Sequence, residues 1–264
     1  MTFALSIAFG GIVGFALGLT GGGGSLLAVP LLVYGLSIAP REAIGISLAA
    51  VGVTALLGVV PRWRSGQVEA GTGLLFALAG MVGAPLGTWV AALIPEAFLL
   101  TLFALLMLSI ATRMWINEPG TQPTSAIATI CERSESGQLQ LTTPCAIILL
   151  SVGVLTGFLS GMFGVGGGFV IVPALVLFSQ MPIHRAVATS LLVIVLVSLS
   201  GVTSHVVAGR GIAWDVTGLF VAGGFLGMLL GGRFSEKISG PRLQKVFAAG
   251  IVIVASWILA KSLT

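Results

Sequence analysis

The residues of this chain whose types and spacing could do chemistry are glycines and hydroxyl side chains in a phrase that occurs twice. Residues 14–25 read GFALGLTGGGGS, and residues 157–168, which lie 143 positions later, read GFLSGMFGVGGG. The phrase belongs to a duplicated module, because the same register continues beyond it. The matched pairs are Pro30/Pro173, Ala43/Ala186, Ser47/Ser190, Gly58/Gly201 and Gly66/Gly209, followed after one inserted residue by Gly80/Gly224, Gly83/Gly227 and Phe103/Phe247.

Such a phrase can bind an anion through the backbone alone. A helix that begins after a glycine turn presents N–H groups that have no partner within the helix, together with the partial positive charge of the helix dipole. Glycine also lets a ligand approach the backbone closely. We expect two such helix starts, near Gly24 and Gly168, to hold one small oxyanion between them. The candidate substrate-binding residues are Thr20, Gly23, Gly24, Ser25, Ser47, Ser160, Gly166, Gly167, Gly168, Thr189 and Ser190.

The alternative interpretation is that the glycines only allow tight helix packing. It suits three small-xxx-small series, which would let helix backbones approach within one chain or between the two copies of a homodimer. These series are Gly10/Gly14/Gly18, Gly153/Gly157/Gly161 and Gly223/Gly227/Gly231. For the two phrases, however, the repetition and the proline at the same place in each following segment favour a binding site.

Ionisable residues are missing from the middle of every apolar segment, where Asp, Glu, Lys and Arg do not occur. This excludes a pump that relies on a buried carboxylate relay. We predict no enzyme, metal or cofactor, because no Ser/Lys, Ser/His or HExxH arrangement is present. Cys131 and Cys145 are expected to be free thiols. His184 and His205 lie at segment ends and are predicted to be ordinary interfacial residues, with a pH-sensitive mouth at His205 as the alternative.

The elements that must position the phrases are membrane helices. Hydrophobic residues make up 56% of the 264 residues and charged residues 8%, and the mean hydropathy is +1.13. This chain has too little polar surface for a soluble globule. No barrel-type alternation of polar and apolar residues occurs, so the apolar segments are predicted to be helices. They lie at about 3–20, 25–37, 43–60, 71–91, 97–116, 145–163, 168–179, 186–204, 214–232 and 246–260.

Two transmembrane repeats of about five segments each are predicted, residues 1–116 and 144–264, joined by a polar linker at 117–143. The segments after the phrases are too short to cross a bilayer core of roughly 30 Å. If each phrase is the tip of a hairpin, the crossing number per half is odd and the repeats are inverted. If each phrase only interrupts one long helix, the repeats are parallel.

Basic residues favour the inverted arrangement. It puts nine of them on one side (Arg62, Arg64, Arg113, Arg133, Arg185, Arg233, Lys237, Arg242 and Lys245) and only Arg41, Arg210 and Lys261 on the other. The parallel arrangement divides the same residues six and six. The bias of Lys and Arg toward the cytoplasm therefore predicts a cytoplasmic linker and both termini outside. The same loops explain the net charge of +4, so no nucleic-acid partner is expected.

At this point the second phrase, followed by Val172-Pro173 and by residues 184–191 (HRAVATSL), resembles the sulfite exporter TauE/SafE family of bacterial membrane permeases. The first half departs from it, since Thr20 and Gly22 stand at the positions of Phe163 and Val165. Residues 45–47 (GIS) likewise replace 188–190 (ATS), so the two halves need not contribute equally. The resemblance implies export or exchange of sulfite, sulfoacetate, thiosulfate or a related anion across the cytoplasmic membrane.

We therefore expect an all-α polytopic membrane protein that exports sulfite or a related small sulfur anion by alternating access. An uptake carrier for an organosulfonate or thiosulfate, a passive anion channel and a non-transporting membrane scaffold are the alternatives. The substrate anion, the direction, the coupling ion and the oligomeric state stay open, as does the choice between re-entrant and fully spanning segments after the phrases.

Overall fold

The structure is a computed structural model that describes residues 2–116, 142–178, 181–235, 252 and 256. These residues form helices and turns, without a strand among them, and six helices are long and apolar enough to cross a membrane. The predicted all-α polytopic fold class is therefore confirmed. The elements are α1 (Thr2–Thr20), η1 (Gly23–Leu27), α2 (Ala28–Pro30), η2 (Leu31–Gly35), α3 (Pro40–Arg64), α4 (Ala70–Leu93), α5 (Glu96–Ile116), α6 (Thr143–Phe163), α7 (Gly168–Phe178), α8 (Ile183–Val207) and α9 (Trp214–Ser235).

The two segments after the glycine phrases are short, as expected. Residues 23–35 form a 3-10 turn, one turn of α-helix and a π-helical turn in succession, whereas α7 is a regular helix of 11 residues. The π-helical turn follows Pro30, whose ring removes a backbone N–H from the helical ladder and so permits the wider winding. The tenth predicted segment, except residues 252 and 256, and nearly all of the polar linker lie outside the described residues.

The helices pair mainly across the two halves of the chain. Helix α1 packs along α9, and α6 packs along α4. Both contacts depend on glycine: a Cβ built on Gly14 would lie 2.0 Å from the carbonyl oxygen of Gly224, and one built on Gly157 would lie 2.0 Å from that of Gly80. The small-xxx-small series thus serve helix contacts within one chain.

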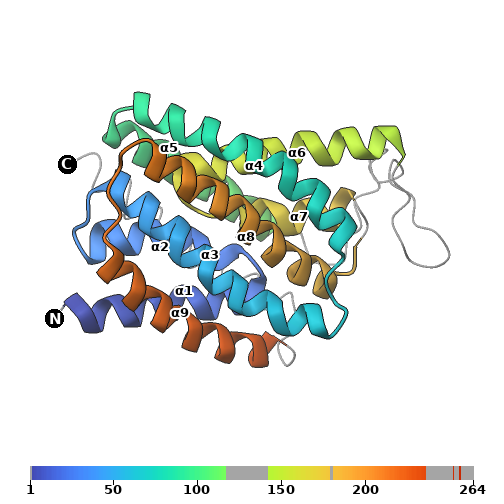
Figure 1. The fold of residues 1–264 in the computed structure, drawn as a ribbon, viewed down its shortest axis with the longest axis horizontal. Helices are drawn as coiled ribbons and strands as arrows, with labels where there is room; N and C mark the ends of the chain where they lie inside the picture. The colour runs from blue at the N-terminus through green and yellow to red at the C-terminus, as the bar shows by residue number, and fades with distance from the viewer. Residues whose placement is uncertain (1, 117–141, 179–180, 236–251, 253–255, 257–264) are drawn as a thin grey trace.

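Helices α3 and α8 form the centre of the bundle. They pack on each other, and 78% and 61% of their apolar windows are buried, against 50% or less for the other candidate spans. In Figure 1, α3 begins at the left end of the bundle and α8 at the right end, so the two run in opposite directions. The same opposition is visible for α1 and α6, and for α4 and α9.

One expectation about cysteine is wrong. Cys145, near the start of α6, is fully buried and disulfide-bonded rather than a free thiol. The chain has two cysteines, and the other, Cys131, lies outside the described residues. The spacing rules failed because they test for metal ligands and redox motifs and do not test for a structural disulfide.

Candidate functional site

The two glycine phrases meet backbone to backbone inside the bundle. A Cβ built on Gly22 would lie 2.4 Å from the carbonyl carbon of Gly168, and one built on Gly168 would lie 2.4 Å from the Cα of Gly22. All residues from 21 to 26 and from 160 to 168 are buried. We call this contact the glycine junction, defined by residues 21–25 and 164–168, and it brings together the glycines that the sequence singled out.

The junction requires glycine for conformation as well as for space. Gly21 in the first phrase and Gly164, Gly166 and Gly167 in the second have φ angles between +66° and +74°. This left-handed region is strained for residues that carry a Cβ. Gly21 also packs on Val187 and Gly164 on Ile44, and these two contact residues are themselves 143 positions apart.

Two of the predicted hydroxyls hold the opposite phrase in place. The Oγ of Ser47 on α3 donates a hydrogen bond of 2.5 Å to the carbonyl oxygen of Gly164. The Oγ of Ser190 on α8 donates one of 2.7 Å to the carbonyl oxygen of Gly21. Each central helix therefore secures the glycine turn of the other half, and these two hydroxyls have a structural role.

Three further predicted hydroxyls bond to the backbone. Thr20 Oγ1 accepts a hydrogen bond from the N–H of Gly23, at 2.9 Å, and Ser25 Oγ donates to the carbonyl oxygen of Gly22. Thr189 makes no such bond to a glycine phrase. Its Oγ1 accepts a hydrogen bond from the N–H of Glu69, which precedes α4.

Ser160 differs from these residues. Its side chain is fully buried, and its Oγ has no hydrogen-bond partner among the described residues. Ser198 on α8 is 1% exposed, and its Oγ also has no hydrogen-bond partner among the described residues. A Cβ built on Gly166 would lie 3.5 Å from this Oγ. Sequence reasoning missed Ser198, since the matching position in the first half is Ala55 and the repeat therefore gave no signal.

The second glycine turn also presents open backbone donors. The N–H groups of Val165, Gly166 and Gly167 have no hydrogen-bond acceptor among the residues that the structure describes. They lie directly before α7, where the helix dipole adds partial positive charge. An oxyanion, which offers several acceptors, suits this set of donors.

No Lys, Arg, Asp or Glu is buried as a whole residue in the described structure, but the Nη1 of Arg62 is buried, and its Nη2 donates a hydrogen bond of 3.0 Å to the carbonyl oxygen of Gly18. The described residues contain no group of His, Cys, Asp and Glu that could hold a metal ion. His205 lies in the last turn of α8, and its side chain is fully buried in the bundle because Gly45 on α3 leaves room for its ring: a Cβ there would lie 2.7 Å from Nε2. Its ring nitrogens have no hydrogen-bond partner among the described residues.

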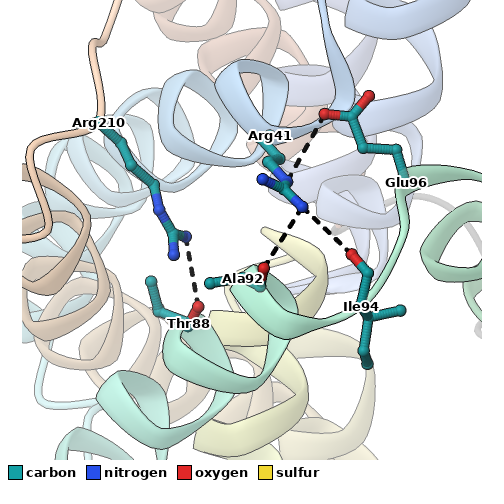
Figure 2. Close-up of polar contacts among 6 residues, drawn as sticks. All are labelled: Arg41, Thr88, Ala92, Ile94, Glu96 and Arg210. Atoms are coloured by element: carbon teal, nitrogen blue, oxygen red, sulfur yellow. Dashed lines mark hydrogen bonds and ion pairs between the residues drawn. The ribbon is translucent and has the colours of Figure 1, made fainter.

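Arg41, Glu96 and Arg210 lie near one another at one end of the bundle (Figure 2). Arg41 forms an ion pair of 3.6 Å with Glu96 and donates to the carbonyl oxygens of Ala92 and Ile94. Arg210, in the loop after α8, donates to the carbonyl oxygen of Thr88. Burial and the positive charge of Arg41 lower the pKa of the Arg210 guanidinium. This end therefore carries two neighbouring basic side chains.

Comparisons with known proteins agree with the resemblance seen in the second phrase. The model of the family described as Sulfite exporter TauE/SafE matches residues 6–258. A probable membrane transporter protein of Xylella fastidiosa strain Temecula1 is 37% identical over 98% of this chain and 95% of its own length. The probable membrane transporter protein YunE of Bacillus subtilis is 26% identical over 96% of both chains. No solved structure matches this chain.

Proposed function

Because this chain belongs to the sulfite exporter TauE/SafE family of membrane transporters, we propose that it exports sulfite or a related small sulfur anion across a bacterial cytoplasmic membrane. The anion binds at the glycine junction. The observation that carries this proposal is the contact of Gly22 with Gly168, where two glycine turns meet in the buried centre of the bundle. Corresponding breaks in two halves are a recurrent site of substrate binding in secondary transporters.

The mechanism is alternating access by two inverted repeats. The opposite directions of α1 and α6, of α3 and α8, and of α4 and α9 support the inversion (Figure 1). The reciprocal bonds from Ser47 to Gly164 and from Ser190 to Gly21 support it too, because a two-fold relation between halves makes contacts in such pairs. Rocking of one half against the other would expose the junction to each side in turn.

The positions of the helix ends support a membrane orientation. The C-terminal ends of α3 and α9 and the start of α8 lie at one end of the bundle (Figure 1), and by sequence they carry Arg62, Arg64, Arg233 and Arg185; the start of α3 and the end of α8, next to Arg41 and Arg210, lie at the other. The richer side faces the cytoplasm under the positive-inside rule. The linker is then cytoplasmic, and both termini are outside.

An uptake carrier and an anion channel would use the same junction. A channel needs a continuous pore, and single-channel currents would reveal it, whereas a carrier saturates at low turnover. The tight packing favours the carrier, since a Cβ on Gly166 would already lie 3.0 Å from Val51 and 3.3 Å from Ile194. The direction of net transport depends on the gradients and has to be measured.

Thermal stabilisation of the purified protein tests the proposal. A ligand that binds only the folded state raises the unfolding midpoint in proportion to its saturation. Sulfite, thiosulfate, sulfoacetate, sulfate, chloride and taurine are compared at matched ionic strength. We expect a selective rise with at least one sulfur anion. Equal responses to all of these anions, or none, would contradict a sulfur-anion site.

A further inference from the structure

We propose that the substrate is bound by the second half alone, through Ser160, Ser198 and the open amides of Val165, Gly166 and Gly167, and that this site selects a singly charged sulfur anion. This inference rests on the proposed function, since it specifies the site and the charge of the transported anion. Hydrogensulfite and organic monosulfonates belong to this class of ligand. Doubly charged sulfite, sulfate and thiosulfate do not.

The first step is the presence of unused donors in the second half. Ser160 and Ser198 are 0% and 1% exposed, and their Oγ atoms have no partner among the described residues. A buried hydroxyl that stays without a hydrogen bond is destabilising. Both lie beside the turn, as a Cβ on Gly167 would be 3.4 Å from the Cβ of Ser160, and one on Gly166 would be 3.5 Å from Ser198 Oγ. A ligand with acceptor oxygens would satisfy both groups.

The second step is the absence of these donors from the matching positions of the first half. Leu17 occupies the position of Ser160 and Ala55 that of Ser198, and both are fully buried. The backbone differs in the same sense at one of the three amides, that of Gly23 and its match Gly166. In the first turn, Thr20 Oγ1 accepts the N–H of Gly23. The matching residue, Phe163, has no hydroxyl, so the N–H of Gly166 stays open.

The third step concerns charge. The donors of this site, hydroxyls and amides, neutralise no charge. The guanidinium of Arg62, whose Nη1 is buried, donates to the carbonyl oxygen of Gly18 on α1, in the first half. The energy needed to move an ion out of water grows with the square of its charge, so a dianion costs about four times as much to bury as a monoanion of the same size. A site made only of neutral donors therefore discriminates against dianions.

Binding measurements on matched serine variants test which half holds the anion. The affinity of the purified protein for sulfite is measured by calorimetry for the wild type, Ser198→Ala and Ser160→Ala. Loss of a donor to a charged ligand should weaken binding roughly tenfold or more. Ser200→Ala is the control: Ser200 lies two residues after Ser198 on α8, and its Oγ already donates to the carbonyl oxygen of Met81. It should leave the affinity unchanged.

The first half is tested by adding the missing hydroxyl. Ala55→Ser should not restore sulfite binding to Ser198→Ala, because the amide of Gly23 is already occupied. Equal affinities in the wild type, Ser160→Ala and Ser198→Ala would overturn the assignment of the site, as would restored binding in the double variant.

The charge of the ligand is tested with the wild type across pH. Sulfite takes up a proton near neutral pH and becomes hydrogensulfite, so its apparent affinity should rise as the pH falls, while that of methanesulfonate should stay constant. Sulfate should bind far more weakly than either. Tighter sulfite binding at high pH, or sulfate binding equal to that of methanesulfonate, would overturn the charge selection. If no sulfur anion binds at all, the proposed function itself fails; if sulfite binds and the serine variants or pH have no effect, only this inference fails.

Discussion

Serine residues close to the glycine junction differ in what their hydroxyls bind. Ser47 and Ser190 donate to carbonyl oxygens of the opposite turn, whereas Ser160 and Ser198 have no partner among the described residues. The sequence predicted that hydroxyls would surround the phrases, and Ser25, Ser47, Ser160 and Ser190 do lie there. It could not predict which are occupied, because the acceptors of Ser47 and Ser190 lie more than 100 residues away.

We expect Ser47→Ala and Ser190→Ala each to lower the free energy of unfolding by about 1–3 kcal/mol, since each leaves a buried carbonyl oxygen without this donor. The midpoint of thermal unfolding in detergent measures the effect. Ser109→Ala is the control: Ser109 is exposed and its Oγ bonds to the carbonyl oxygen one turn earlier in α5. Unfolding midpoints equal to those of the wild type and of this control would show that the two bonds do not secure the turns.

The helices themselves were easier to predict than the contacts between them. The apolar segments predicted each helix in the described ranges, because length and hydropathy are local properties of the sequence. Which helices pack on each other could not be predicted in this way. Small-xxx-small spacing predicts that a close contact exists, but the packing of α1 on α9 and of α6 on α4 is set by the arrangement of the whole chain. The π-helical turn after Pro30 was also missed, since a single proline is compatible with several helix distortions.

A bulky residue at a glycine contact should prevent these helices from pairing. Gly14→Val places its Cβ 2.0 Å from the Gly224 carbonyl oxygen, which is backbone and cannot rotate away. We expect loss of monodisperse protein in size-exclusion chromatography. Gly218→Ala on α9 is the matched control, as nothing lies within 4 Å of its added Cβ. Alanine there should raise the free energy of unfolding by about 0.5–1 kcal/mol through its higher helix propensity. Equal yields of folded Gly14→Val and wild type would contradict the contact.

For the whole molecule, the proposed orientation places the arginine-rich end of the bundle in the cytoplasm. Ser65 follows α3 at the end rich in arginine, and Gly211 lies beside Arg210 at the other end. In a variant without Cys131 and Cys145, Gly211→Cys should react with a membrane-impermeant maleimide in intact cells. Ser65→Cys should react only after the membrane is opened. The reverse pattern would contradict the cytoplasmic placement of the linker.

The disulfide at Cys145 provides a second check of the same orientation. Disulfides persist in oxidising compartments and are reduced in the cytosol. If α6 starts on the cytoplasmic side, the bond at Cys145 should be reduced in the cell. Because the side chain is buried, alkylation of Cys145 is then expected in cells that are rapidly quenched in acid and unfolded in denaturant without added reductant. A bond that survives in quenched cells would place the start of α6 outside, against the distribution of the arginines.

Flux measured in proteoliposomes shows directly whether the protein transports sulfite. Purified protein is reconstituted, and uptake of radiolabelled sulfite is followed against liposomes without protein. The account predicts protein-dependent uptake that saturates with sulfite concentration and is reduced by competing sulfur anions. Uptake equal to that of empty liposomes would contradict transport of sulfite, and uptake that rises linearly without saturation would contradict a carrier with a binding site at the glycine junction.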